Sequence, residues 1–345
     1  LDQHRRGFEN FIGDRLGLRG APRRDERNEV RSRDQYAQLQ WALDARRSVL
    51  LGLRHADVQF DSRDRYIVGS NPDDSGSVSY GRTTPVAGYL QRFSPSLRGW
   101  LSWGRGFETP TFNELSYRAD GGAGLALDLR PATSRAMEAG LAGSDDGIAW
   151  QLVAHRSDTE DELVVARNVA GRSSFRNVGA TRRQGVEAQL DWRLTDTLDL
   201  QATLSWLDAR FRQGFLRCSG AGCTDPSTPV AAGSRIPGIA ARQAFIRLGW
   251  RPALQWELAL EAQALSSVVV SDGASERAPG HALLNALISR DWSLQGSTLT
   301  TFLRLDNLAD RNYVGSVIVN EGNGRFYEPG PGRSVLVGVQ WDWRR

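Results

Sequence analysis

Apolar and polar residues alternate along most of the chain. In residues 198–206, leucine, alanine and tryptophan occupy every second position, and aspartate, glutamine, threonine and serine lie between them. The same period recurs in residues 186–192, 256–263 and 334–343. Successive side chains of a β-strand point to opposite faces, so the pattern predicts strands with one apolar and one polar face. A helix would scatter these apolar residues around its axis, and we reject that interpretation.

On this basis the chain is predicted to be all-β, with about thirteen strands. They span residues 30–43, 47–60, 86–93, 97–104, 134–142, 147–157, 183–193, 197–210, 238–250, 254–267, 281–291, 297–306 and 332–343. Many exceed the roughly 5–6 residues usual in soluble sheets. They suit the roughly 9–11 tilted residues that cross a bilayer, and no apolar run is long enough for a transmembrane helix.

The connections between these strands alternate between short and long. The short ones are residues 44–46, 94–96, 143–146, 194–196, 251–253 and 292–296. The long ones are residues 61–85, 105–133, 158–182, 211–237, 268–280 and 307–331. This alternation predicts a transmembrane antiparallel β-barrel with tight periplasmic turns at one end and extracellular loops at the other. A propeller predicts shorter strands and a repeat of roughly 40–50 residues, and a sandwich does not predict the alternation.

Composition agrees with a barrel. The mean hydropathy of the 345 residues is −0.43, which alternating strands produce by averaging. The eleven tryptophans fall mostly near predicted strand ends, as in an aromatic girdle at the membrane interfaces. The 43 basic residues, all arginine, are interspersed with 40 acidic ones, so no nucleic-acid partner is indicated.

Catalytic and metal-site motifs are absent from the sequence. The four histidines are widely separated, and neither a His-Glu-x-x-His nor a Gly-x-Ser-x-Gly motif occurs. We therefore expect no enzyme, no metal site and no cofactor, with a barrel hydrolase as the enzyme alternative. Cys218 and Cys223 are expected to form a short disulfide in a long outer loop, because the cell surface is oxidising. A metal or redox pair is the alternative.

Three segments carry a family resemblance. Residues 103–115 (WGRGFETPTFNEL), 177–187 (NVGATRRQGVE) and 305–313 (LDNLADRNY) resemble, in this order, barrel segments of TonB-dependent outer-membrane receptors. Gly338, Trp341 and Trp343 of the final strand resemble the C-terminal signal read by the barrel-assembly machinery. Arg344 and Arg345 after the last aromatic depart from that signal, as does Leu336 where a polar residue is usual.

The resemblance implies a 22-stranded barrel in the outer membrane of a Gram-negative bacterium, plugged by an N-terminal domain that contacts TonB. An odd count of thirteen strands cannot close an antiparallel barrel. We therefore expect the chain to be the C-terminal portion of such a barrel, without its N-terminal strands and plug. Residues 1–29 would be an outer loop leading into the barrel, and residues 30–345 the barrel itself. The expected partners are TonB through the N-terminal part, the barrel-assembly machinery, lipid and lipopolysaccharide.

The resemblance also implies active uptake of an iron chelate, a ferric siderophore or ferric citrate. Arginine binds carboxylates bidentately, and aromatic rings pack against an organic chelate. The candidate ligand-binding residues in the outer loops are Arg105, Phe107, Arg118, Arg167, Arg172, Phe175 and Arg176. Contact with lipopolysaccharide phosphates is the alternative role for these arginines. The alternative functions are a passive porin-like or structural barrel, and a receptor for vitamin B12 or haem.

Overall fold

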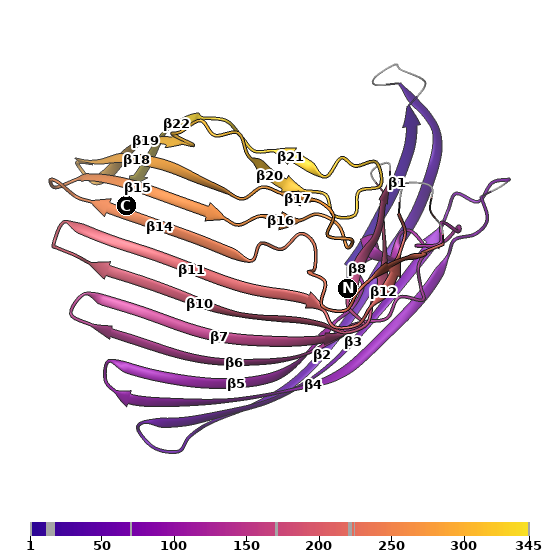
Figure 1. Cartoon of the computed structure of the whole chain (residues 1–345), viewed down its shortest axis with the longest axis horizontal. Coiled ribbons are helices and arrows are strands. Elements are labelled where there is room, and N and C mark those ends of the chain that lie inside the picture. Colours follow the sequence, from indigo (N-terminus) through magenta and orange to yellow (C-terminus); the bar gives the residue numbers. More distant parts are fainter. Residues whose placement is uncertain are drawn as a thin grey trace.

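The computed structural model describes residues 2–11, 18–69, 71–169, 172–219, 223 and 225–343. It is almost entirely β, and fourteen strands form one curved antiparallel sheet (Figure 1). Along this sheet the strand order is β1-β2-β3-β4-β5-β6-β7-β10-β11-β14-β15-β18-β19-β22, so each strand pairs with its neighbour in the chain apart from small hairpins inserted between them. The predicted fold class, an antiparallel β-barrel fragment, is confirmed.

The thirteen predicted strands all occur, several of them longer than expected. The sheet strands are β1 (Asp2–Phe11), β2 (Arg19–Ala42), β3 (Arg47–Asp64), β4 (Gly76–Ser94), β5 (Leu97–Glu108), β6 (Ala132–Asp145), β7 (Ile148–Glu160), β10 (Thr181–Arg193), β11 (Leu198–Phe211), β14 (Arg242–Trp250), β15 (Trp256–Leu265), β18 (His281–Leu294), β19 (Ser297–Asp306) and β22 (Ser334–Trp343). The strand that the periodicity missed is β1. In the described sheet β1 and β22 are the two edges, and they do not pair with each other.

The segment expected to be a loop, residues 1–29, is instead largely a β-hairpin. β1 pairs with the first part of β2 from Asp2 opposite Val30 to Phe11 opposite Arg19, whereas Leu1 and residues 12–17 lie outside the described residues. Polar pairs join the two strands, including Arg5 to Asp25 at 2.6 Å. Because charged residues occupy both faces here, no apolar alternation marks these strands in the sequence. The position of this hairpin relative to the membrane stays a prediction.

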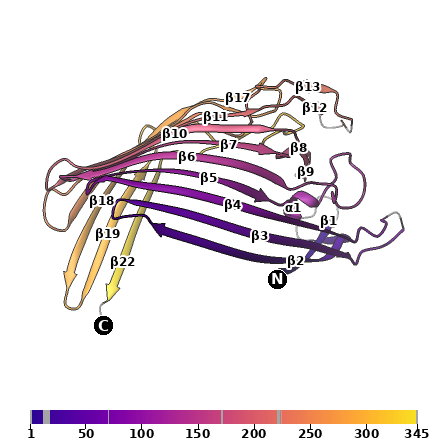
Figure 2. The same cartoon turned by 90° about the horizontal axis from the view of Figure 1, so that it is seen from below.

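Short turns and long connections lie at opposite ends of the sheet, here named the turn end and the loop end (Figures 1 and 2). The long connections are partly folded. Their described residues contain one short helix, α1 (Phe112–Leu115), and four hairpins: β8 (Leu163–Val169) with β9 (Arg172–Asn177), β12 (Phe215–Arg217) with β13 (Thr228–Val230), β16 (Val268–Val269) with β17 (Arg277–Ala278), and β20 (Val314–Val317) with β21 (Tyr327–Pro329). Among the described residues, no helix has the length and apolar character to span a membrane.

The two faces of the sheet differ as the alternation predicts. One face carries exposed apolar side chains such as Leu204, Ile246 and Val337. The opposite face carries charged side chains in register: Arg247 lies 3.1 Å from Asp199, and Arg304 lies 2.8 Å from Glu261. In a membrane barrel the apolar face contacts lipid and the polar face lines the lumen. We call them the apolar face and the polar face.

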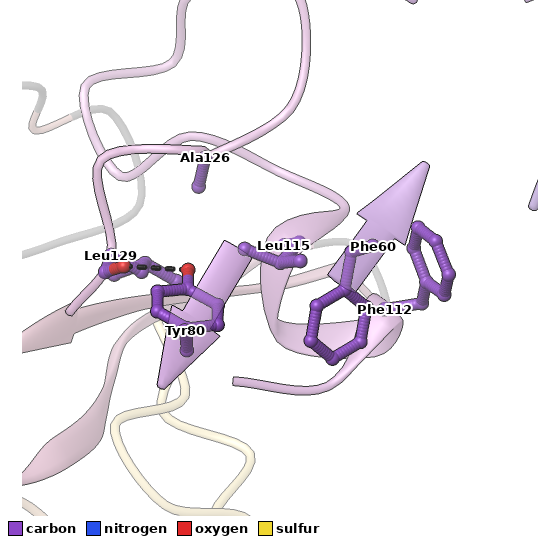
Figure 3. Packing of buried hydrophobic residues seen from close by; sticks show 6 residues of the cluster. All are labelled: Phe60, Tyr80, Phe112, Leu115, Ala126 and Leu129. Atoms are coloured by element: carbon purple, nitrogen blue, oxygen red, sulfur yellow. Dashed lines mark hydrogen bonds between the residues drawn. The ribbon is translucent and has the colours of Figure 1, made fainter. Parts of the chain in front are cut away.

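The largest buried apolar cluster lies at the loop end. Phe60 and Tyr80 of the sheet pack there against α1 and the chain that follows it (Figure 3). The hydroxyl of Tyr80 donates a 2.7 Å hydrogen bond to the backbone oxygen of Leu129. Thr111 and Glu114 form a capping box that begins α1 and directs Leu115 into this cluster. The long 109–131 connection is therefore folded onto the ends of the strands.

Candidate functional site

A pocket of about 520 Å³ lies beside this cluster at the loop end. Its walls come from the 109–131 connection, from β9 and from the connection between β12 and β13. The lining residues are Arg118, Ala119, Asp120, Ala126, Asp128, Leu129, Arg130, Phe175, Arg176, Asn177 and Pro226. The lining thus combines three arginines and two aspartates with apolar side chains, a composition suited to an anionic ligand with an organic shell.

Like Arg130, Arg118 is an exposed arginine of this pocket. Its side chain is 43% exposed and lies 2.6 Å from Asp120. The hydrogen bond from Arg118 holds the pKa of the Asp120 carboxyl well below its ordinary value. Because the pair is exposed, an incoming carboxylate can exchange with Asp120 at small cost.

Arg130 and Asn177 fix the shape of the pocket. The Arg130 backbone N–H donates to the Asn177 side-chain oxygen, and the Asn177 amide donates back to the Arg130 carbonyl, both at 2.8 Å. The same amide donates to the Asp161 carbonyl at 2.7 Å, and the Asp161 carboxylate lies 2.7 Å from the Arg130 guanidinium. Asn177, from one of the three family-like segments, therefore joins two long connections.

Arg176 is held by other loops rather than free in the pocket. Its guanidinium donates to the Leu216 carbonyl at 2.5 Å, lies 4.7 Å from the Phe215 ring centre, and lies 3.7 Å from the buried Asp272 carboxylate. Burial lowers the pKa of Arg176 and raises the pKa of Asp272, and the attraction between the two charges opposes both shifts. Arg176 therefore shapes the pocket wall and adds positive charge behind it.

Of the seven predicted ligand residues, the structure brings together Arg118, Phe175 and Arg176. Arg105 and Phe107 lie within β5 rather than in the loop after it. Arg105 is exposed opposite Arg135 of β6, and Phe107 packs against the buried cluster around α1. Neither residue lines the pocket, and their role in ligand binding stays a prediction.

Arg167 and Arg172 lie on the β8–β9 hairpin, and their guanidinium groups contact residues outside the pocket lining. Arg167 donates a 2.5 Å hydrogen bond to the backbone oxygen of Cys223. Arg172 lies 5.6 Å from the centre of the Tyr117 ring, and Arg24 lies 5.4 Å from the same ring. The hydrogen bond of Arg167 and the cation–π contact of Arg172 each join two separate loops. A ligand role for these two arginines also stays a prediction.

The predicted cysteine and assembly-signal residues have clear positions. Cys218 and Cys223 are joined in a disulfide with a Cα–Cα distance of 5.5 Å, in the connection between β12 and β13. Trp341 and Trp343 stack with their ring centres 6.2 Å apart on the apolar face of β22. Gly338 lies under the ring of Phe302, where a Cβ would overlap the ring. Recognition of these three β22 residues by the assembly machinery stays a prediction.

The sequence also matches a known family. Residues 3–308 match the family model described as "TonB dependent receptor-like, beta-barrel". The chain belongs to this family. Its members are transport receptors of the Gram-negative outer membrane rather than enzymes, so the resemblance seen in the three segments is confirmed.

Solved receptors share the fold at low sequence identity. The siderophore receptor PiuA from Acinetobacter baumannii has a TM-score of 0.72 at 17% identity, over 93% of this chain and 44% of that one. The ferric citrate transporter FecA has a TM-score of 0.72 at 17% identity, over 94% and 47%. The copper transporter OprC has a TM-score of 0.69 at 16% identity, over 93% and 48%. The chain thus spans less than half the length of these transporters.

Sequence reasoning missed the acidic and amide side chains of the site. Asp120 and Asp128 line the pocket, and the buried Asp272 lies against the far side of Arg176. Asp272 comes two positions after a run of three valines, a signal of burial that is visible in the sequence. The pairing of Asp272 with Arg176, almost a hundred positions earlier, leaves no local pattern to detect.

Proposed function

We propose that this chain supplies the ligand-capturing end and part of the wall of an outer-membrane receptor for an anionic iron chelate, with the loop end facing outward. The observation that carries the proposal is the pocket whose lining includes Arg118, Arg130 and Arg176 together with Phe175 and Leu129. Guanidinium groups bind the carboxylate and phenolate oxygens that chelate iron, and the apolar floor contacts the organic part of the chelate.

The nature of the solved relatives supports this ligand class. PiuA is a siderophore receptor, and FecA is a ferric citrate transporter. We propose that this chain takes a ligand of the same type. Energy supply through TonB is the further part of the proposal, and membership of the TonB-dependent receptor family supports it.

The direct test is binding and uptake of radiolabelled iron chelates by cells that carry the protein in their outer membrane. We expect saturable binding, and uptake that stops when TonB is deleted. Arg118→Ala should weaken binding by roughly ten- to a hundredfold, the effect of one charge-assisted contact. Arg63→Ala, which removes an exposed arginine of β3 outside the pocket, is the matched control and should bind as the wild type does.

The outcomes separate the competing functions. Uptake that is unsaturable and independent of TonB would identify a passive barrel and contradict the proposal. Saturable uptake of copper, vitamin B12 or haem, without uptake of ferric chelates, would keep the receptor function and exclude the iron chelate. Equal binding by wild type and Arg118→Ala would remove the pocket from the ligand path.

A further inference from the structure

Arg290 occupies an unusual position on the apolar face near the turn end. In the register of the sheet it lies opposite Trp256 of β15 and opposite Thr301 of β19. Its guanidinium carbon lies 5.0 Å from the ring centre of Trp256 and 3.7 Å from that of Trp292. The indole N–H of Trp292 donates a 3.0 Å hydrogen bond to the Thr301 hydroxyl, which fixes that ring against the arginine.

No protein anion neutralises Arg290 within the part of the chain that the structure describes. No ion pair joins its guanidinium to a described carboxylate, and its buried Nε has no hydrogen-bond partner. Arg247 and Arg304 on the polar face differ, because each lies within 3.1 Å of a carboxylate. A charge on a lipid-facing strand is costly unless it reaches the interface and finds an opposite charge.

The surrounding tryptophans place Arg290 at the level of the lipid headgroups. Eight of the eleven tryptophans lie near the turn end of their strands: Trp41, Trp150, Trp192, Trp250, Trp256, Trp292, Trp341 and Trp343. Tryptophan rings gather at the membrane–water interface, between the acyl chains and the headgroups. Arg290 lies within this belt, so its free N–H groups are at the depth of the headgroup phosphates.

We infer that Arg290, Trp256 and Trp292 form a binding site for the phosphate of a membrane phospholipid headgroup, in the leaflet next to the turns. The flat guanidinium stacks on the indole of Trp292, which leaves its edge N–H groups to donate to phosphate oxygens. The indoles contact the glycerol and upper acyl chain of the same lipid. Phosphate supplies the negative charge that the described protein residues do not. This site is separate from the pocket of the proposed function.

The test is native mass spectrometry of the protein extracted from the outer membrane, stripped of lipid, and titrated with phosphatidylglycerol in detergent. Removing one arginine contact to an anionic lipid weakens binding about fivefold, so Arg290→Gln should shift the dissociation constant by that factor. Arg251→Gln is the matched control. Arg251 lies at the same end but faces Asp199 at 3.1 Å, and its loss should leave lipid binding unchanged.

Each outcome decides the matter. Equal lipid affinity in Arg290→Gln and wild type overturns the inference, as does equal weakening by Arg251→Gln. Should Arg290→Gln fail to assemble, Arg290→Lys serves instead, because it keeps the charge without the flat donor edge: affinity below wild type supports the site, and equal affinity contradicts it. Displacement of the lipid by inorganic phosphate at millimolar concentration would assign the site to the free anion.

Discussion

At the scale of single residues, Arg118 is the pocket cation whose carboxylate partner, Asp120, lines the same pocket. It is exposed, and its guanidinium lies 2.6 Å from the Asp120 carboxylate. An anionic chelate must therefore compete with the Asp120 carboxylate for the same guanidinium. The sequence identified Arg118 because arginine in an outer loop is a visible signal. It gave no way to recognise Asp120 as the competitor, since acidic residues are frequent in every loop.

Because Asp120 competes with the ligand, its removal should strengthen binding, whereas removal of a residue that contacts the ligand should weaken it. Asp120→Asn removes the competing charge, so binding of an anionic iron chelate should tighten by roughly two- to fivefold. Arg118 lowers the pKa of Asp120 below its unfolded value near 3.8, so the carboxylate stays charged at every pH above that value. The gain should therefore be constant from about pH 5 to about pH 8. Titration of the chelate against the protein's tryptophan fluorescence measures it.

A control for the change in charge is Asp145→Asn, which lies at the turn end and far from the pocket in the fold. This variant should bind the chelate as the wild type does. Weaker binding by Asp120→Asn would show that the carboxylate supports the ligand instead of competing with it, and would contradict this account of the pocket.

At the scale of elements, residues of the family-like segments hold the ends of strands and the loops together through hydrogen bonds. Asn177 joins the 109–131 connection to the β8–β9 hairpin. Asn307, at a positive φ of 51°, accepts from the Arg311 N–H and donates to the Arg311 carbonyl, so it closes the start of the connection between β19 and β20. The Thr111–Glu114 capping box begins α1. These segments are recognisable because each of these hydrogen-bonding arrangements needs particular side chains at fixed spacing.

The contact between β19 and β22 gives a prediction at this scale. Gly338 lies under the Phe302 ring, opposite it in the register, and a Cβ there would overlap the ring. Gly338→Ala should therefore destabilise the folded barrel by about 1–3 kcal/mol, the usual cost of overpacking. Adding Phe302→Leu should recover most of that loss. The folded fraction in a urea titration, read from the heat-modifiable band on gels, measures both variants.

This pair of variants also separates packing from recognition by the assembly machinery. If the machinery reads Gly338 itself, assembly in cells should fail in the double variant as well as in the single one. Recovery of both stability and assembly in the double variant would assign Gly338 to packing alone.

The strands were predictable from sequence and the loop contacts were not, for a physical reason. A strand between lipid and lumen must alternate over its whole length, so strands such as β11 and β22 are evident from residue type alone. β1 was missed because polar pairs such as Arg5–Asp25 replace apolar alternation there. The contact of Arg167 with the Cys223 carbonyl depends on how two distant loops fold together, so the sequence of neither loop predicts it.

At the scale of the whole molecule, the long loops are joined around one buried carboxylate. Asp272 is 2% exposed, between Arg176 of β9 and the Asn320 amide, which donates to it at 3.1 Å. The same amide donates to the Val165 carbonyl at 2.8 Å. Contacts of this kind make the loop end a connected structure, which gives the pocket a defined shape before a ligand arrives.

Asp272 predicts how stability changes with pH. Burial raises its folded-state pKa above the unfolded value of 3.8, so at a pH between these two pKa values the native state holds a proton that the unfolded state has lost. Its contribution to stability therefore rises as pH falls through the folded pKa and is lost as pH rises. The stability of wild type relative to Asp272→Asn should increase from about pH 7 to about pH 4. Unfolding temperatures of both proteins across this range measure the slope, and a flat or opposite trend would contradict the burial argument.

We propose that the loop-end pocket holds the iron chelate. The most direct measurement is an anomalous difference map at the iron edge, from crystals of the protein grown with a ferric chelate that it binds. We predict one iron peak inside the pocket bounded by Arg118, Arg130 and Phe175, with chelate oxygens on the arginines. An iron peak elsewhere in the barrel, with this pocket empty of chelate, would contradict the account.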